Sequence, residues 1–277
     1  MITDDNNMII MTYMHGLGNQ MFQYALQRSL EKKGKIVKSN TMLYDKYFNM
    51  RKFELTSVFE NIKLNPAPQL CNCIVYNENL IHSSIFIPDI LDLNTSVPCI
   101  LNGFFQTEKY FLDIREDLLQ QFKFNITDKL LNEISNSIKN SKKPIVSIHV
   151  RRTDYLGSPM HNICTETYYK NAINEIYNRL NTKDIEFIVF SDDIEYCKTL
   201  FPDFTYIDKN QFEDYKDWYD MYLMSCCHHN IISNSSFAWW AAWLNQNQNK
   251  LVLAPNKWLN GLPTYDIWCE DWIKVNV

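Results

Sequence analysis

The stretch MIIMTYMHGLGNQMFQYALQRSLEKKGKIV (Met8–Val37) contains the successive elements of an α/β fold. Residues 8–14 are apolar and β-prone, which is typical of a strand buried on both faces. Apolar residues in the middle of the stretch recur at the i, i+4, i+8 spacing of a helix, and Gly34 stands where a helix ends in a C′ glycine. Because Lys35–Val37 begins a second strand, the stretch predicts a β–loop–α–β unit.

The second half of the chain alternates between strand and helix patterns. Strands are expected at 144–150, 185–191, 204–207, 230–233 and 251–254, and helices at 165–180, 194–201, 214–229 and 236–246. Such alternation predicts a parallel sheet covered by helices on both faces. With the βαβ start, it favours an α/β architecture of two Rossmann-like domains facing a cleft.

The boundary between the two domains is expected at the polar stretch NSKKP, which gives domains 1–140 and 141–277. Residues 111–140 have a helical pattern. Residues 40–110 are irregular, with scattered proline, asparagine and aromatic residues, and no order of elements follows from them.

Bulk composition excludes several protein classes. The net charge of −5 argues against a general nucleic-acid binder, which needs a basic surface. No apolar run is long enough to span a bilayer, and acidic residues stand where a signal peptide has basic ones. The eight cysteines lack metal-ligand spacing, including those of CNC and CCHH, so we expect reduced thiols and no metal site. A cytoplasmic protein is expected, compatible with peripheral association at the inner face of a membrane.

The strongest functional signal is SIHVRRTDY (Ser147–Tyr155), where a predicted strand ends in two arginines. Ligands of open α/β sheets bind beyond the carboxyl ends of the strands, which places Arg151 and Arg152 at a binding site. Strand alternation puts His149 and Arg151 on one face and Arg152 on the other. We therefore expect one arginine to bind an anionic ligand through its planar fork while the other pairs internally, with Asp154 orienting a guanidinium. A purely structural arginine–aspartate pair is the alternative.

The motif VFSDD places Asp192 and Asp193 at the end of the next predicted strand. One carboxylate could accept hydrogen bonds from a guanine base or a ribose, while the other caps the following helix. Which aspartate has which role stays open. A shared metal ion is disfavoured because adjacent side chains diverge.

A third motif, ISNSSFAWWAAWL, runs from a predicted strand into a helix. The helix start offers free N–H groups to an anion, and Asn234, Ser235 and Ser236 add polar side chains there. Simple capping by serine is the alternative. The tryptophans of this motif follow helical spacing, which favours a place in the core.

The loop HGLGNQ raises the question of a dinucleotide site. That fingerprint needs a third glycine, where methionine stands here, and an acidic residue about 20 positions later, which is missing. Gly16 and Gly18 instead predict a tight turn that a ligand can approach. Asn19 and Gln20 offer neutral hydrogen-bonding groups suited to sugar hydroxyls, and His15 is either a ligand contact or an ordinary loop residue.

Taken together, GLGNQMFQYA, HVRRTDY, FSDD and NSSFAWWAAWL resemble the α-1,2-fucosyltransferases of glycosyltransferase family 11, in the family's order. The HxRRxD block is shared with α-1,6- and protein O-fucosyltransferases, and Thr153 and Ala238 depart from the family's usual Gly and Ser. The resemblance implies a GT-B fold, GDP-β-L-fucose as donor, inversion at the anomeric carbon and no cofactor or metal.

The resemblance also implies roles for the residues of each motif. The two arginines would meet the GDP diphosphate, and the aspartate of the same block would orient them. His149 is grouped with them as a catalytic candidate because it converges on the same strand end, not because of the resemblance. One aspartate of FSDD would face guanosine, and the NSS motif the phosphates. The glycine turn, with its flanking histidine, asparagine and glutamine, would line the fucose and acceptor side. No residue is marked as a general base.

The predicted activity is transfer of L-fucose to the 2-OH of a terminal β-galactoside, in a bacterial enzyme of surface-polysaccharide synthesis. Alternatives are another linkage (α-1,6 or α-1,3), an inactive GDP-sugar-binding protein, and an NAD-dependent oxidoreductase. The acceptor is not determined by the sequence. Nucleic acid is not expected as a partner.

Overall fold

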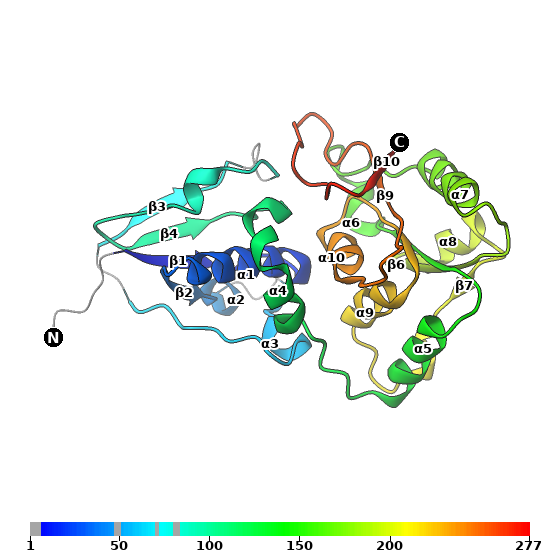
Figure 1. Cartoon of the computed structure of the whole chain (residues 1–277), viewed down its shortest axis with the longest axis horizontal. Helices are drawn as coiled ribbons and strands as arrows, with labels where there is room; N and C mark the ends of the chain where they lie inside the picture. The colour runs from blue at the N-terminus through cyan, green and yellow to red at the C-terminus, as the bar shows by residue number, and fades with distance from the viewer. Residues whose placement is uncertain (1–6, 47–50, 70–71, 80–83) are drawn as a thin grey trace. The chain divides into compact units, whose positions relative to one another are not determined.

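A computed structural model of the chain describes residues 7–46, 51–69, 72–79 and 84–277. The chain forms two compact units. Unit 1 is Met1–Asn125 with Pro263–Cys269, and unit 2 is Ile126–Leu262 with Glu270–Val277. Each unit contains a parallel β-sheet with helices packed beside it (Figure 1), so the predicted α/β class is confirmed.

The sheet of unit 1 has the strand order β2-β1-β4-β3, with parallel pairing throughout the described residues. Its strands are β1 (Met8–Thr12), β2 (Ile36–Asn40), β3 (Ile74–Asn77) and β4 (Cys99–Asn102). Its α-helices are α1 (Leu17–Lys32), α2 (Met42–Lys46), α3 (Leu55–Val58) and α4 (Arg115–Gln121). Short 3-10 helices are η2 (Pro88–Ile90), η3 (Glu108–Tyr110) and η4 (Leu112–Ile114).

The predicted β–loop–α–β unit is present as β1, α1 and β2. β1 is buried along its whole length, as its apolar sequence predicts for a strand covered on both faces. Gly34, two residues beyond α1, has φ +81, the left-handed conformation that favours glycine after a helix. This turn allows the chain to reverse directly into β2 beside β1.

The sheet of unit 2 has the order β10-β9-β8-β5-β6-β7, again with parallel pairing. Its strands are β5 (Ile145–Val150), β6 (Glu186–Ser191), β7 (Thr205–Tyr206), β8 (His229–Ile231), β9 (Val252–Pro255) and β10 (Ile273–Val275). Its helices are α5 (Lys129–Lys139), α6 (Thr153–Leu156), α7 (Glu166–Leu180), α8 (Ile194–Leu200), η5 (Lys209–Gln211), α9 (Trp218–Cys226) and α10 (Ser236–Leu244).

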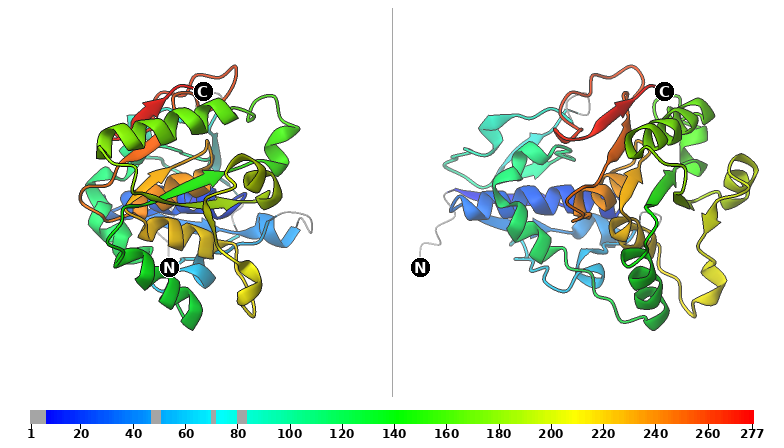
Figure 2. Two further views of the ribbon diagram at one scale, coloured as in Figure 1. Left: turned by 90° about the vertical axis from the view of Figure 1, so that its right-hand side faces the viewer. Right: turned by 45° about the vertical axis from the view of Figure 1, so that its right-hand side comes forward.

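Helices cover both faces of the sheet of unit 2 (Figure 2). Val146, Ile148 and Val150 of β5 pack in one cluster with buried residues of α7 and α8. The alternate residues of β5 face the other side, where α9 and α10 pack together. The tryptophans of α10 are buried in the core, as their spacing predicted.

Residues 111–140 are helical only in part. The chain forms η4 and α4, then runs without helix until α5. Asp128 starts α5 because its carboxylate accepts a hydrogen bond from the Leu131 N–H at 3.0 Å.

The passage between the units lies before α5, whereas the sequence placed it after that helix. α5 belongs to unit 2, where Lys139 donates to the Tyr222 hydroxyl of α9 at 3.3 Å. Residues 263–269 return to unit 1, where Asp266 forms an ion pair with Lys109 at 2.6 Å. Local composition cannot report either packing choice, because both depend on contacts that are distant in sequence.

The helix expected over 214–229 is shorter than predicted. α9 ends at Cys226, and His229 already lies in β8. The Nδ1 atoms of His228 and His229 accept hydrogen bonds from the N–H groups of Ile145 and Leu251, both at 3.0 Å. These imidazoles therefore complete the backbone pairing at the start of the strands.

Candidate active site

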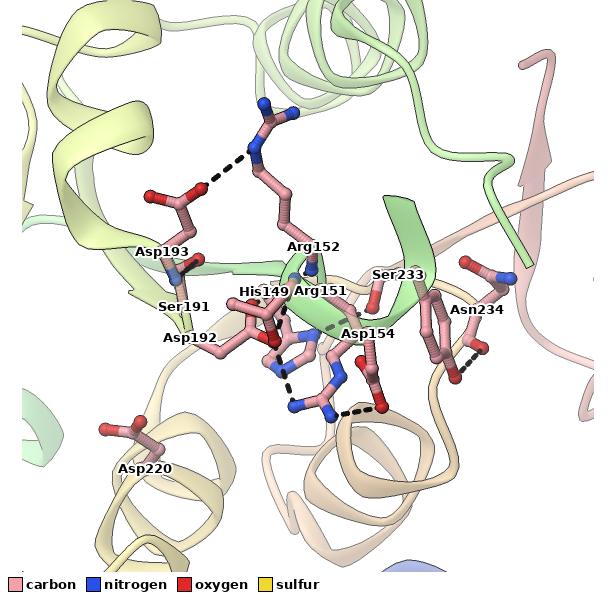
Figure 3. A network of polar contacts seen from close by, with 12 residues as sticks. His149, Arg151, Arg152, Asp154, Ser191, Asp192, Asp193, Asp220, Ser233 and Asn234 are labelled. Atoms are coloured by element: carbon pink, nitrogen blue, oxygen red, sulfur yellow. Dashed lines mark hydrogen bonds and ion pairs between the residues drawn. The ribbon is translucent and has the colours of Figure 1, made fainter. Parts of the chain in front are cut away.

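Three loops of unit 2 meet at the carboxyl ends of adjacent strands. β5 lies between β6 and β8 in the sheet, so the residues that follow these three strands are brought together. Figure 3 shows the resulting network, in which Arg151 and Arg152 follow β5, Asp192 and Asp193 follow β6, and Ser233 follows β8. The parallel topology thus unites three motifs that lie far apart in the sequence.

Arg151 is held between two carboxylates. Its Nη2 lies 2.8 Å from Asp154 Oδ2, and its Nη1 lies 3.1 Å from Asp192 Oδ2. Burial opposes the charge, yet the hydrogen bond to Asp154 and the charge of Asp192 raise the pKa of Arg151 above its ordinary value. Asp154 therefore orients a guanidinium as predicted, and Arg151 stays charged at any physiological pH.

Arg152 extends from the strand end to the side opposite Arg151 (Figure 3), as the alternation of the strand predicted. Its Nε donates to Asp193 Oδ2 at 2.9 Å, and its guanidinium carbon lies 3.5 Å from the centroid of the Tyr196 ring. Both arginines therefore pair internally, and the expectation that only one would do so is wrong. Arg152 is held through Nε, which leaves its two terminal nitrogens extending beyond the network drawn in Figure 3.

The two aspartates of FSDD have different structural roles. Asp193 caps α8 by accepting a hydrogen bond from the Tyr196 N–H at 3.2 Å. Asp192 accepts from the Arg152 N–H at 2.9 Å and from the Thr153 hydroxyl at 2.5 Å, which holds the start of α6. The predicted division is confirmed for the cap. The other carboxylate is engaged by the chain itself.

His149 is buried on β5, with its Nδ1 2.8 Å from the Ser233 hydroxyl. Burial first, and then the positive charge of Arg151, lowers the pKa of His149 to about 3. The imidazole is therefore neutral near pH 7. A neutral ring can accept or donate a hydrogen bond at this strand end but adds no charge to it.

The residues of the NSS motif have different positions: the asparagine is buried, and the serines lie at the start of α10. Asn234 is buried, and its amide donates to the carbonyl oxygens of His161 and Trp258, both at 3.0 Å. It therefore joins two loops, and the predicted role of Asn234 in donor binding stays a prediction. Ser235 is the N-cap residue of α10, but its hydroxyl makes no capping hydrogen bond, while Ser236 begins the helix. The first turn of α10 thus keeps N–H groups for an anion.

In the loop between β1 and α1 of unit 1, the residue with a left-handed backbone conformation is His15. His15 has φ +65, whereas Gly16 is extended at φ −79 and Gly18 is buried in the first turn of α1. A Cβ atom at Gly16 would lie 3.0 Å from Arg51 Cδ, so this glycine makes room for a neighbouring side chain. The turn is tight as predicted, but the left-handed residue is the histidine.

Two amides of the same loop differ in exposure. Gln20 is fully buried, and its Nε2 donates to the carbonyl oxygens of His15 and Lys52, both at 2.9 Å. The amide holds the loop, and its predicted contact with a sugar stays a prediction. Asn19 is half-buried and accepts from Gln106 Nε2 at 2.8 Å, so it lies at the surface of this edge.

A polar turn at the carboxyl edge of the sheet of unit 1 was not predicted from the sequence. Glu78, which follows β3, is buried and accepts hydrogen bonds from the N–H groups of Phe104 and Phe105, which follow β4. Burial raises the pKa of Glu78 to about 7. The run CILN before glycine could have indicated the strand that leads into this turn, but it lies in the region 40–110, which could not be assigned.

An ion pair of the buried Asp220 in unit 2 was also not predicted from the sequence. Lys209 Nζ lies 2.9 Å from Asp220 Oδ2, and the Tyr215 hydroxyl donates to the other carboxylate oxygen. Burial raises the pKa of Asp220, while the positive charge of Lys209 contributes to the low pKa of His149. A single aspartate in the apolar run WYDMYLM was the signal for it.

Among the described residues, no group of three His, Cys, Asp or Glu side chains could hold a metal ion. The described cysteines, from Cys73 to Cys269, are free thiols, and Cys71 lies outside the described residues. No described helix combines the length and the apolar character that crossing a membrane requires.

Comparison with known proteins identifies the family. The model of glycosyl transferase family 11 matches residues 12–276. The chain belongs to glycosyltransferase family 11. An α-1,2-colitosyltransferase of Escherichia coli is 32% identical, covering 94% of this chain and 96% of that protein. The O-antigen biosynthesis glycosyltransferase WbnK of Escherichia coli is 30% identical, covering 94% and 98%.

This family 11 chain is also similar, more distantly, to a human protein and to a solved structure. The human galactoside α-(1,2)-fucosyltransferase 1 is 24% identical over 64% of this chain and 52% of that protein. The structure of the NodZ α-1,6-fucosyltransferase soaked with GDP-fucose has a TM-score of 0.54 at 13% identity, covering 94% and 99%. The predicted GT-B fold is therefore confirmed.

The arrangement in this family 11 chain is suited to stabilising a departing anion. Two guanidiniums are held by carboxylates at adjacent strand ends, and the start of α10 lies at the end of the neighbouring β8. Fixed donors of this kind stabilise developing negative charge because they do not reorganise during the reaction.

Proposed function

We propose that the chain transfers L-fucose from GDP-β-L-fucose to the 2-OH of a terminal β-galactoside, with inversion and without a metal ion. The pair of guanidiniums at the carboxyl end of β5, held in part by the aspartates that follow β6, carries this proposal. In such a transfer the bond from the anomeric carbon to the diphosphate oxygen breaks, and negative charge grows on the leaving diphosphate. Arg152, with its terminal nitrogens beyond the network, and the first turn of α10 supply donors for that charge.

The roles of the site residues follow from their contacts. Arg151 and Asp154 form a fixed pair, so Arg151 offers the diphosphate its positive charge from a constant position. His149 is neutral and supplies a hydrogen bond at the same strand end. The hydroxyls of Ser235 and Ser236 would meet the phosphates at the helix start. Binding of the diphosphate would compete with the carboxylates that now neutralise the guanidiniums.

A second donor has specific support. The relative at 32% identity is an α-1,2-colitosyltransferase, and colitose is L-fucose without its 3-hydroxyl. A site that hydrogen-bonds the 3-hydroxyl would reject the deoxy sugar strongly, whereas a site that merely tolerates it would accept both. A colitosyl donor is therefore the alternative to fucose for the same reaction.

The acceptor is proposed to bind at unit 1, beside His15 and Asn19. Both side chains reach the surface of the carboxyl edge, and neither is charged near pH 7, because burial, aided by the charge of Arg51, lowers the pKa of His15. Neutral groups of this kind suit sugar hydroxyls. The relatives named for O-antigen synthesis and for galactoside transfer support a glycan acceptor. We propose that the reaction takes place in the cytoplasm, on a precursor of a bacterial surface polysaccharide.

The decisive experiment supplies GDP-fucose or GDP-colitose with a panel of β-galactosides and determines the product linkage by NMR. An α-1,2 product supports the proposal. An α-1,3 or α-1,6 product, or GDP binding by calorimetry without turnover, contradicts it. Full loss of activity with EDTA would contradict metal independence.

The arginine role has its own test. Arg151→Lys keeps a charge but loses the fork, and we expect at least a roughly 10-fold loss of kcat/KM. Arg179→Lys is the matched control, because that arginine pairs with Glu175 on the surface of α7. Equal activity in both variants would exclude Arg151 from diphosphate binding.

A further inference from the structure

A turn at the carboxyl edge of unit 1 is built around Glu78. The Glu78 side chain is 7% exposed, and Oε2 accepts hydrogen bonds from the Phe104 N–H at 2.6 Å and the Phe105 N–H at 3.0 Å. Oε1 also lies 3.2 Å from the Phe105 nitrogen. One carboxylate therefore satisfies two successive backbone donors that follow β4.

The turn needs this carboxylate to keep its shape. Phe105 has φ +53, a left-handed conformation that a residue with a bulky side chain adopts only when its surroundings require it. Its ring is fully buried and lies edge-on to Tyr110 at 6.0 Å. The backbone is thus fixed from one side by the Glu78 oxygens and from the other by packing of the ring.

Gly103 is the position that admits the Glu78 side chain. A Cβ atom there would lie 2.5 Å from Glu78 Cβ and 2.8 Å from Oε2, distances that packed atoms do not reach. The Gly103 carbonyl accepts from Gln23 Nε2 of α1 at 2.9 Å. Glycine and glutamate are therefore fitted to each other, and the turn is tied to α1 as well.

The turn presents two side chains beside residues of the proposed acceptor side. Along 103–107 burial alternates, so that Phe104 and Gln106 reach the surface while their neighbours are buried. The Phe104 ring lies 5.0 Å from the His15 ring, and Gln106 donates to Asn19 at 2.8 Å. An aromatic ring can pack against the apolar face of a pyranose, and an amide beside it can form hydrogen bonds with the hydroxyls of the same sugar.

We propose that Glu78 is a positioning residue for the acceptor, which holds the Phe104–Gln106 turn so that its ring and amide form a pyranoside subsite with His15 and Asn19. This inference rests on the proposed function, because it assigns the acceptor to unit 1. It adds Phe104 and Gln106 to the residues that touch the sugar. Glu78 acts only through them.

The state of the Glu78 carboxyl determines how firmly the turn is held. A carboxylate accepts stronger hydrogen bonds than a neutral acid, and burial raises the pKa of Glu78 to about 7. Among the described residues, the titratable groups that interact electrostatically with Glu78 include Tyr76 on β3 and Tyr110 in η3. Burial raises the pKa of both tyrosines above their ordinary value, so neither changes charge near pH 7. Acceptor binding should therefore weaken as pH falls through about 7.

Two substitutions separate the contributions. Glu78→Gln keeps an oxygen for the two N–H groups but cannot ionise, so we expect a roughly 3- to 10-fold higher acceptor KM and loss of the limb near neutral pH. Glu78→Ala removes the oxygens that accept hydrogen bonds from the turn, so we expect the KM for the sugar acceptor to rise by about 10-fold or more, with the KM for the sugar donor unchanged. Glu116→Gln removes an exposed carboxylate of the same unit and is the matched control.

Hydrogen–deuterium exchange of the segment 103–106 measures the same effect without turnover. We expect exchange about 10-fold faster in Glu78→Ala than in wild type, and unchanged in Glu116→Gln. Unchanged protection in Glu78→Ala would overturn the proposal, as would equal rises in the donor and acceptor KM. If the wild type transferred sugar to no galactoside, the proposed function would fail, and exchange would still decide whether Glu78 positions the turn.

Discussion

The loops at the carboxyl edges of the two parallel sheets are held together by different polar groups. In unit 2, the loops after β5 and β6 are joined by ion pairs of Arg151 and Arg152 with aspartates. In unit 1, the loops after β1 and β4 are joined by amides, with Gln23 accepting from the Met14 N–H at 3.1 Å and donating to Gly103. The loops of one edge are held mainly by ion pairs and those of the other mainly by neutral amides, and this difference lies in the loops and not in the strands that precede them.

Removing a guanidinium tests the ionic edge most severely. We expect Arg152→Ala to lower kcat by about 100- to 1000-fold, because it removes donors for the leaving diphosphate and leaves Asp193 without its ion-pair partner. Steady-state kinetics with GDP-fucose measures this loss. A comparable loss in Lys198→Ala, which breaks an exposed pair on α8, would show that the effect is not specific to the site.

Removing a buried amide is the corresponding change at the neutral edge. Gln20→Leu removes the hydrogen bonds that Gln20 makes to the carbonyls of His15 and Lys52 and accepts from the N–H of Glu54, so we expect the free energy of unfolding to fall by about 3 kcal/mol. Urea unfolding measures it, with the exposed Gln246→Leu as control. If both variants were equally stable, the amides would not hold this edge.

Acid should act on the two edges in opposite directions. The pKa of Glu78 is raised to about 7 in the folded protein, so the folded protein binds a proton at Glu78 more tightly than the unfolded chain does. The contribution of Glu78 to the free energy of unfolding therefore rises as pH falls. The pKa of His149 is lowered to about 3, so stability from this group is lost as pH falls below its unfolded value of about 6.5. Between about pH 8 and pH 5 each change amounts to about 2 kcal/mol.

The variants Glu78→Gln and His149→Gln separate these two contributions. From about pH 8 to about pH 5, the free energy of unfolding of Glu78→Gln should fall relative to that of wild type. The free energy of unfolding of His149→Gln should rise relative to wild type over the same range. Urea unfolding at both pH values measures the differences. A shift of the same sign in both variants would contradict the contrast between the edges.

The smallest expected effect concerns the strained histidine. His15 has φ +65, and its carbonyl is held by Gln20 at 2.9 Å and by the Tyr44 hydroxyl at 2.7 Å. His15→Gly should raise the free energy of unfolding by up to about 1 kcal/mol, since glycine adopts this conformation without strain. Thermal unfolding measures it. A fall in stability would show that the ring contact with Phe104 outweighs the strain.

Prediction from sequence succeeded where local pattern and topology agree. The alternation of strands and helices after residue 140 and the buried tryptophans of α10 follow from periodicity, because side-chain burial repeats with the period of each element. That Asp154 orients one of the two guanidiniums was also predicted, because it lies in the same short motif, and the structure shows that this arginine is Arg151. The second pairing, of Arg152 with Asp193, was missed because it joins two loops 41 residues apart.

By itself, the sequence determined the α/β class, the family motifs and the presence of two arginines at a strand end, because each depends on residues close together in the chain. Tertiary structure alone decided that the buried amides of Gln20 and Asn234 hydrogen-bond to neighbouring loops. It also decided that α5 belongs to unit 2 and that Glu78 accepts hydrogen bonds from the turn after β4. Strand order in a parallel sheet brings distant loops to one edge. A polar residue in a loop therefore cannot be assigned to a ligand or to the protein until its neighbours across that edge are known.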